Sequence, residues 1–165
     1  MIIMKKKAII LLGILIISSI FMISAGANYT QTLSENPCQG GMHNPVLQFT
    51  QTPRPSGDGT LTVSAIGDYN AQSEWIEVII EGTSLGQWVP GVQCGGFRTK
   101  TYTVTRSQLL QWASDGKIEV TLVQGPSVNC ICSTNTNNVT LEYPGANNSL
   151  PMNWIIKKFG LGKEK

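Results

Sequence analysis

Charged side chains are scarce in this sequence of 165 residues. Asp, Glu, Lys and Arg together make up 13% of it, about half the share that is usual in soluble proteins. The chain has a single histidine, His43, and it has no Gly-rich phosphate loop and no C-x-x-C-H motif. The residue patterns of P-loop proteins and c-type haem proteins are therefore missing. We expect a protein that is not an enzyme.

Glycine, by contrast, is abundant, with 17 residues, and Thr, Ser and Asn are frequent. Together with the low charge, this composition argues against a coiled coil, a helical bundle or a charge-driven disordered chain. A length of 165 residues allows one compact domain.

Residues 1–27 have the pattern of a secretory signal peptide. Three consecutive lysines at 5–7 precede an uncharged run over residues 8–23. The small residues that signal peptidase needs follow at positions 25–27. The pattern predicts cleavage before Asn28 and a protein that is secreted or held at the cell surface.

Two alternatives for this segment stay open. Left uncleaved, it would act as an anchor, although its apolar length is marginal for a span of about 20 residues. Alternatively, Lys7-Ala8-Ile9 resembles the short cleavage site of archaeal type IV pilin precursors. Cleavage after Ala8 would retain the apolar helix, which in that family packs into a filament core.

The two parts of the chain after the signal peptide differ in charge. Residues 28–150 carry nine acidic and five basic side chains, a net charge of −4, whereas residues 151–165 carry four lysines and one glutamate. Without a basic field on its body, the protein is not expected to bind nucleic acid.

Residues 145–165 are predicted to form a linker and a cationic amphipathic tail. Its candidate contact residues for an anionic membrane surface or a partner are Trp154, Ile155, Lys157, Lys158 and Phe159. Docking of the tail on the acidic body explains the same residues, so both interpretations remain.

Four cysteines, Cys38, Cys94, Cys130 and Cys132, follow the predicted signal peptide. An even number in an exported chain predicts two disulfides. A Cys130–Cys132 bridge would close a very small, strained ring. Cys38 and Cys94 are therefore each expected to pair with one member of that late segment, and which pairs with which stays open. A metal site of these thiols with His43 is the alternative, but paired C-x2-C knuckles are absent.

From residue 46 onward, apolar and polar residues alternate in about seven short runs separated by turn residues. Leu61, Val63 and Ala65, for example, alternate with Thr and Ser, which is the period of a half-buried strand. Ser107 is expected to cap one short helix. No long helical segments separate the strands, which argues against a parallel α/β fold.

The sequence therefore predicts an all-β fold, an antiparallel two-sheet sandwich of jelly-roll type with one short helix, over residues 46–144. Residues 28–45, with two prolines and two glycines, are predicted to form an irregular N-terminal arm.

A family resemblance rests on the strand pattern of this domain. The segments concerned are Gly59-Thr60-Leu61-Thr62-Val63, Gly67-Asp68, Glu74-Trp75-Ile76-Glu77-Val78, Glu81-Gly82 and Leu85-Gly86. In these features residues 45–143 resemble secreted β-sandwich modules of the CUB-like and convertase-P-domain-like kind, in which two strands flank an acidic turn. The resemblance implies a β-sandwich, secretion and a binding role, and it carries over no catalytic residue.

Candidate ligand-binding residues surround the predicted acidic turn. Trp75 and Trp88 have the opposite parity to the apolar residues of their strands, which predicts two exposed rings that contact a sugar or a protein. Burial of the rings beneath the helix or the second sheet is the interpretation that we prefer, and the exposed pair is the alternative that makes them candidates. Asp68 and Glu74 complete the set and, with backbone carbonyls, are candidate ligands for Ca²⁺. No other cofactor or metal is predicted.

Three N-x-[S/T] sequons permit glycosylation in a host with that machinery, at Asn28, Asn138 and Asn147. Altogether the sequence predicts a secreted or cell-surface binding module whose partner is a cell-surface carbohydrate or protein. The alternative is a structural subunit of an extracellular filament or envelope layer, which assembles with copies of itself.

Overall fold

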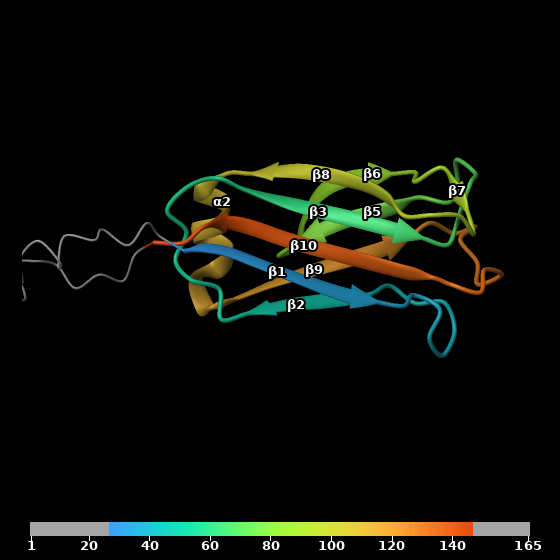
Figure 1. Ribbon diagram of the computed structural model, residues 1–165, viewed down its shortest axis with the longest axis horizontal. Coiled ribbons are helices and arrows are strands. Elements are labelled where there is room, and N and C mark those ends of the chain that lie inside the picture. The colour runs from blue at the N-terminus through green and yellow to red at the C-terminus, as the bar shows by residue number, and fades with distance from the viewer. Residues whose placement is uncertain (1–26, 147–165) are drawn as a thin grey trace, which may run out of the picture. The chain divides into compact units, whose positions relative to one another are not determined.

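Two four-stranded antiparallel sheets face each other in the computed structural model, which describes residues 27–146 (Figure 1). The first sheet has the order β1 (Asn28–Glu35), β10 (Thr136–Pro144), β3 (Gly59–Ile66) and β8 (Arg98–Val104). The second has the order β2 (Val46–Thr50), β9 (Lys117–Gln124), β5 (Ile76–Ile80) and β6 (Thr83–Trp88). A short pair, β4 (Asp68–Tyr69) with β7 (Val92–Gln93), lies at one end.

The strand pairs are nested along the chain. β1 pairs with β10, β2 with β9, β3 with β8 and β5 with β6, all antiparallel. This is the pattern of one long hairpin rolled up so that successive strand pairs alternate between the two sheets, which is a jelly roll. The predicted all-β, two-sheet sandwich with one short helix is confirmed.

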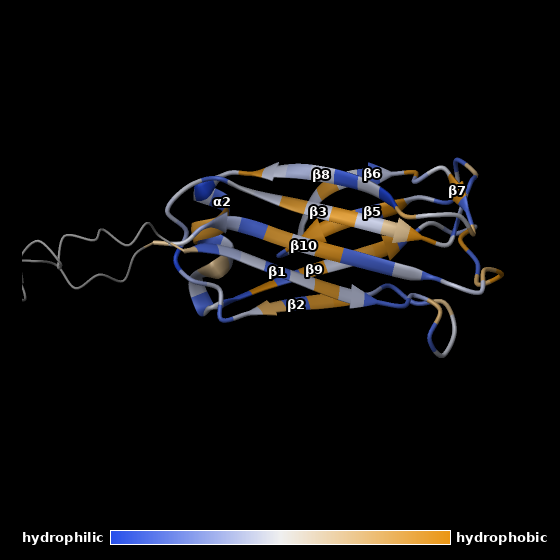
Figure 2. Cartoon of the chain, viewed as in Figure 1, coloured by the Kyte–Doolittle hydropathy of each residue, from blue (hydrophilic) through white to orange (hydrophobic). Residues whose placement is uncertain are grey.

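Strict alternation along the strands builds the core between the sheets. Leu61, Val63 and Ala65 on β3 are fully buried, and their polar neighbours along the strand are only half-buried. β9 repeats the pattern with Ile118, Val120 and Leu122. Figure 2 shows the same alternation as bands along β10. Since every second residue faces inward, the apolar period predicted from the sequence also assigns the inner face of each strand.

The first strand corrects the predicted irregular arm. Residues 28–35 form β1, whose eight residues pair in continuous register with β10. The half-buried side chains of Tyr29 and Leu33 pack against the core, and the Tyr29 ring lies 4.9 Å from that of Tyr143. The strand forms because β10 offers an edge for pairing, although β1 itself has little apolar character. Residues 36–45 are irregular, as expected.

The one α-helix among the described residues, α2 (Arg106–Trp112), covers one end of the sandwich. Its N-cap is Thr105 and not the predicted Ser107. The Thr105 hydroxyl accepts a hydrogen bond from the Gln108 backbone N–H, and the Gln108 side chain accepts from the Thr105 N–H, which completes a capping box. A 3-10 turn (Ala113–Asp115) then leads to Gly116, whose φ of 81° ends the helix in the left-handed region.

Several predictions fall on residues outside the described range 27–146. They are the signal peptide with its two alternatives, the sequon at Asn147, and the tail with Trp154, Ile155, Lys157, Lys158 and Phe159. Within the described range, no helix combines the length and apolarity that a membrane crossing requires.

Candidate binding surface

The candidate pair of exposed tryptophans is not formed, and burial, the interpretation preferred from the sequence, describes Trp88 better. Trp88 lies opposite Ile76 in the register of β5 and β6 and packs, half-buried, against the core. The register shifts between Glu77 and Ile79, and Gly86 on the facing strand has a φ of 98°. Such a β-bulge inverts the parity on which the prediction rested. Trp75 precedes β5 and is half-exposed, so the two rings do not share an outward platform.

Asp68 and Glu74 are also withdrawn from solvent. Their residues are 2% and 7% exposed, so neither carboxylate offers the open acidic turn that the sequence predicted. Burial raises the pKa of the Asp68 carboxyl, and the nearby Glu74 charge raises it further, while a hydrogen bond with the Asn129 side chain lowers it. The two acids are thus neighbours, as expected, but both are buried.

The loops that follow β1, β7 and β9 lie at the end of the sandwich opposite α2 (Figure 1), and two disulfides join them. Cys38 pairs with Cys130 and Cys94 pairs with Cys132, which confirms two bridges to the late segment and decides the pairing that the sequence left open. None of the thiols in the described range is free to form the alternative metal site. His43 instead lies 3.7 Å from a Glu35 carboxylate oxygen.

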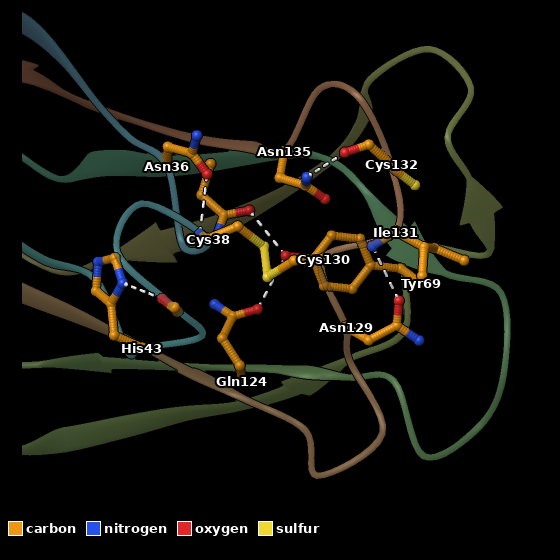
Figure 3. The surroundings of a disulfide bond; sticks show 12 residues. Asn36, Cys38, His43, Tyr69, Gln124, Asn129, Cys130, Ile131, Cys132 and Asn135 are labelled. Carbon is orange, nitrogen blue, oxygen red and sulfur yellow. Dashed lines mark hydrogen bonds between the residues drawn. A yellow bond between two sulfur atoms is a disulfide. The ribbon is translucent and has the colours of Figure 1, made fainter.

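A buried polar network lies beside the Cys38–Cys130 bridge (Figure 3). The Tyr69 hydroxyl donates toward Gln124 Oε1 at 2.9 Å and Asn137 Oδ1 at 3.2 Å. Burial raises the pKa of Tyr69 to about 12, although the hydrogen bond with Asn137 lowers it. The Gln124 backbone N–H in turn donates to Asn44 Oδ1. The network therefore ties β4, β9 and β10 to the N-terminal loop.

Replacing Tyr69 with phenylalanine is expected to cost about 1–3 kcal/mol of unfolding free energy, because the buried oxygens of Gln124 and Asn137 lose their donor. Urea unfolding measures the loss. Tyr102→Phe is the matched control, since the buried Tyr102 hydroxyl has no hydrogen-bond partner, and its removal should change stability by no more than about 0.5 kcal/mol. Equal losses in the two variants would contradict this assignment.

The outer face of the first sheet carries a regular array of hydroxyl groups that the sequence reading missed. Three rows run across β1, β10, β3 and β8. Thr30, Glu142, Thr60 and Thr103 form the first row; Thr32, Thr140, Thr62 and Thr101 the second; Ser34, Asn138, Ser64 and Thr99 the third. All twelve residues are exposed or half-buried. We call this array the hydroxyl face.

Hydrogen bonds between neighbouring strands order the hydroxyl face. The hydroxyl oxygens of Thr32 and Thr140 are 2.8 Å apart, and those of Ser64 and Thr99 are 2.9 Å apart. Since strands are spaced about 4.8 Å apart, the four-strand array spans about 14 Å. The face presents fixed donors and acceptors, and Glu142 is the one charged residue among its twelve.

One end of the hydroxyl face opens into a pocket of about 500 Å³. Its lining residues are Asn28, Asp58, Gly59, Thr60, Thr103, Glu142, Tyr143 and Pro144, and we call it the end pocket. Three of them, Thr60, Thr103 and Glu142, also belong to the first row of the hydroxyl face. The pocket and the face are therefore one continuous surface.

Local backbone geometry shapes the end pocket. A Cβ at Gly59 would come within 2.5 Å of the Glu142 backbone oxygen and 2.7 Å of Tyr143 Cβ, so only glycine lets β3 approach β10 this closely. Asp58 Oδ1 accepts a hydrogen bond of 2.7 Å from the Arg106 backbone N–H at the start of α2. This contact fixes the carboxylate beside the pocket and leaves its second oxygen available to a ligand.

Two of the sequon asparagines lie on this surface. Asn28 lines the end pocket, and Asn138 lies in the third row of the hydroxyl face, where it accepts a hydrogen bond from the Ser34 hydroxyl. The two sequons permit glycosylation at these positions in a host with that machinery.

The sequence contains a signal for the hydroxyl face in its T-x-T spacing. Thr30 and Thr32 on β1, Thr60 and Thr62 on β3, and a run of three alternating threonines on β8 all occupy outward positions. Only the strand order brings these separate segments together.

Comparison with known proteins gives no family. No family model matches the chain, and no curated protein matches it. Among solved structures, latent dimeric PorU from Porphyromonas gingivalis is similar at 8% identity and a TM-score of 0.45, over 73% of this chain and 14% of that chain. The likeness to CUB-like and convertase-P-domain-like modules, beyond the β-sandwich itself, stays a prediction.

Proposed function

We propose that this protein is a non-catalytic extracellular module that binds an uncharged saccharide along the hydroxyl face and in the end pocket. The observation that carries the proposal is the continuity of an ordered hydroxyl array with a pocket that holds two carboxylates, Asp58 and Glu142. Sugar hydroxyls both donate and accept hydrogen bonds. Fixed hydroxyls complement them, and carboxylate acceptors form the stronger, charge-assisted bonds that orient a ligand.

The composition of the surface favours a saccharide over a protein partner. Protein interfaces concentrate aromatic residues, Met and Arg at their centres. The large hydrophobic residues that are exposed in the described part of the chain are Met42, Val46, Phe97 and Ile131, and all of them lie off the hydroxyl face.

The charge of the surface favours a neutral sugar. Asp58 and Glu142 would repel sulfated or uronic-acid saccharides, since like charges in a shared pocket are unfavourable. The two disulfides support the extracellular location in this proposal, because such bridges form and persist in oxidising, extracellular environments.

A glycan array with the purified, oxidised protein tests the proposal, followed by affinity measurements on a neutral saccharide that binds. Glu142→Gln is expected to weaken binding about tenfold or more, since a hydrogen bond to a charged group contributes about 1.5–3 kcal/mol. Thr62→Lys is expected to block the centre of the hydroxyl face. Glu119→Gln, an exposed acid on the opposite sheet, is the control and should bind like the wild type.

Two results would contradict the proposed surface. One is a saccharide whose affinity is unchanged by both Glu142→Gln and Thr62→Lys. The other is a loss of binding in Trp75→Ala, which would place the binding site at this half-exposed tryptophan.

A further inference from the structure

A second polar feature lies at the other end of the sandwich, beside the disulfides, and it is independent of the proposed saccharide surface. Asp68 on β4 is only 2% exposed, and its Oδ1 atom has no hydrogen-bond partner. Glu74, 7% exposed, follows in the loop before β5, where its Oε2 accepts a hydrogen bond of 2.6 Å from the Ala71 backbone N–H.

This arrangement compensates the negative charge only in part, because Asn129 hydrogen-bonds the Asp68 carboxyl but Asp68 Oδ1 has no partner. The charge of Glu74 acts directly on Asp68, and the one ion pair in the described part of the chain, His43 with Glu35, involves neither acid. A buried carboxylate is costly unless it is paired, hydrogen-bonded or bound to a metal. An oxygen as buried as Asp68 Oδ1 therefore indicates a partner that the chain itself does not supply.

We propose that a calcium ion is this partner, bound between the carboxylates of Asp68 and Glu74 and completed by loop oxygens and water. Calcium takes six to eight oxygen ligands in flexible geometry, which loops with carboxylate, amide and carbonyl oxygens provide. Residues 70–73, which connect the two acids, are exposed and give access from solvent. The Asn129 side-chain amide donates a hydrogen bond to the Asp68 carboxyl, and its Oδ1 accepts from the Ile131 backbone N–H, so Asn129 positions the Asp68 carboxyl and is not itself counted as a ligand.

The composition of the site predicts weak binding. In the described part of the chain, no group of three or more His, Cys, Asp or Glu residues is placed to hold a metal, so two carboxylates are all the charged ligands available. Affinity for calcium rises with the charge of its ligands, and extracellular modules bind it with dissociation constants of about 10⁻⁴–10⁻³ M. We expect a value in this range.

A bound calcium ion would stabilise the end of the sandwich that carries the two disulfides. The Cys94 backbone N–H donates to the Gly67 carbonyl oxygen, one residue before Asp68. An ion at Asp68 would thus hold the β4–β7 pair, the loop after it and the segment of Cys130 and Cys132 in one arrangement. These segments are otherwise linked by few regular strand contacts.

Calcium titration by calorimetry, on the full oxidised chain after treatment with a chelator, tests the proposal. The wild type should bind one ion, and its Tm should rise in millimolar Ca²⁺ because a ligand that binds only the folded state stabilises it. Asp68→Asn and Glu74→Gln should each weaken binding at least about tenfold, since each removes a charged ligand. Glu119→Gln, at an exposed site on β9, should bind like the wild type.

The same variants separate a calcium site from a mere acidic pair. In chelator, Asp68→Asn should have a higher Tm than the wild type, because it removes an unpartnered buried charge, and it should gain nothing when Ca²⁺ is added. If Asp68→Asn does not fold, the titration of Glu74→Gln decides. A wild type that binds no calcium at millimolar concentration, or variants that bind as well as Glu119→Gln, would overturn the proposal.

Discussion

Removal of the Cys38–Cys130 bridge, by alanine at both positions, is expected to lower the unfolding free energy by about 4.5 kcal/mol. The bridge joins residues 92 positions apart, and a cross-link that closes a longer loop removes more conformational entropy from the unfolded chain. A loss of this size is a large fraction of the 5–15 kcal/mol that stabilises a typical domain. Urea unfolding of the oxidised proteins measures it.

The second bridge is the internal control for this prediction. Cys94 and Cys132 are 38 positions apart, so the same argument gives about 4 kcal/mol for the variant with alanine at both of these positions. Disulfide mapping by mass spectrometry should also recover the pairs Cys38–Cys130 and Cys94–Cys132. Losses below about 1 kcal/mol, or a larger loss for the shorter loop, would contradict the entropic argument.

Truncation of Phe49 to alanine is expected to destabilise the domain by about 3–5 kcal/mol. The Phe49 side chain on β2 is fully buried in the core between the sheets. Its removal loses transfer free energy and leaves a cavity that the surrounding strands fill only in part.

Val46 on the same strand provides the matched comparison for Phe49. It is 57% exposed, on the outer side of β2, and Val46→Ala should change the unfolding free energy by no more than about 0.5 kcal/mol. Both variants are measured by urea unfolding. If Val46→Ala were as costly as Phe49→Ala, the inward face assigned to β2 would be wrong.

The inner faces of the strands are the part of the fold that the sequence predicts best. Leu61, Val63 and Ala65 alternate with polar residues, and burial of every second residue is a local property of a strand. β1 shows the limit of this reasoning. With only Tyr29 and Leu33 as apolar inward residues, its strand conformation depends on pairing with β10, more than 100 positions away.

The candidate site was harder to predict because it depends on pairing register. Simple alternation along the strand predicts an outward Trp88 side chain. The β-bulge near Gly86 shifts the alternation by one residue, so that the side chain faces inward. The proximity of Asp68 and Glu74 follows from the short turn between them, but their burial depends on loops brought from elsewhere in the chain. The hydroxyl face needs the order of four strands, since Thr32, Thr140, Thr62 and Thr101 become one row only across three pairings.

The most direct test of the proposed function locates a bound saccharide on the molecule. Backbone chemical-shift mapping by NMR, with the isotope-labelled, oxidised protein and a neutral oligosaccharide, provides that location. A ligand at the proposed surface predicts shifts confined to the outward residues of β1, β10, β3 and β8 and to Asp58 and Gly59 beside the end pocket. Shifts centred instead on Trp75 and residues 67–75, with the hydroxyl face unchanged, would contradict it.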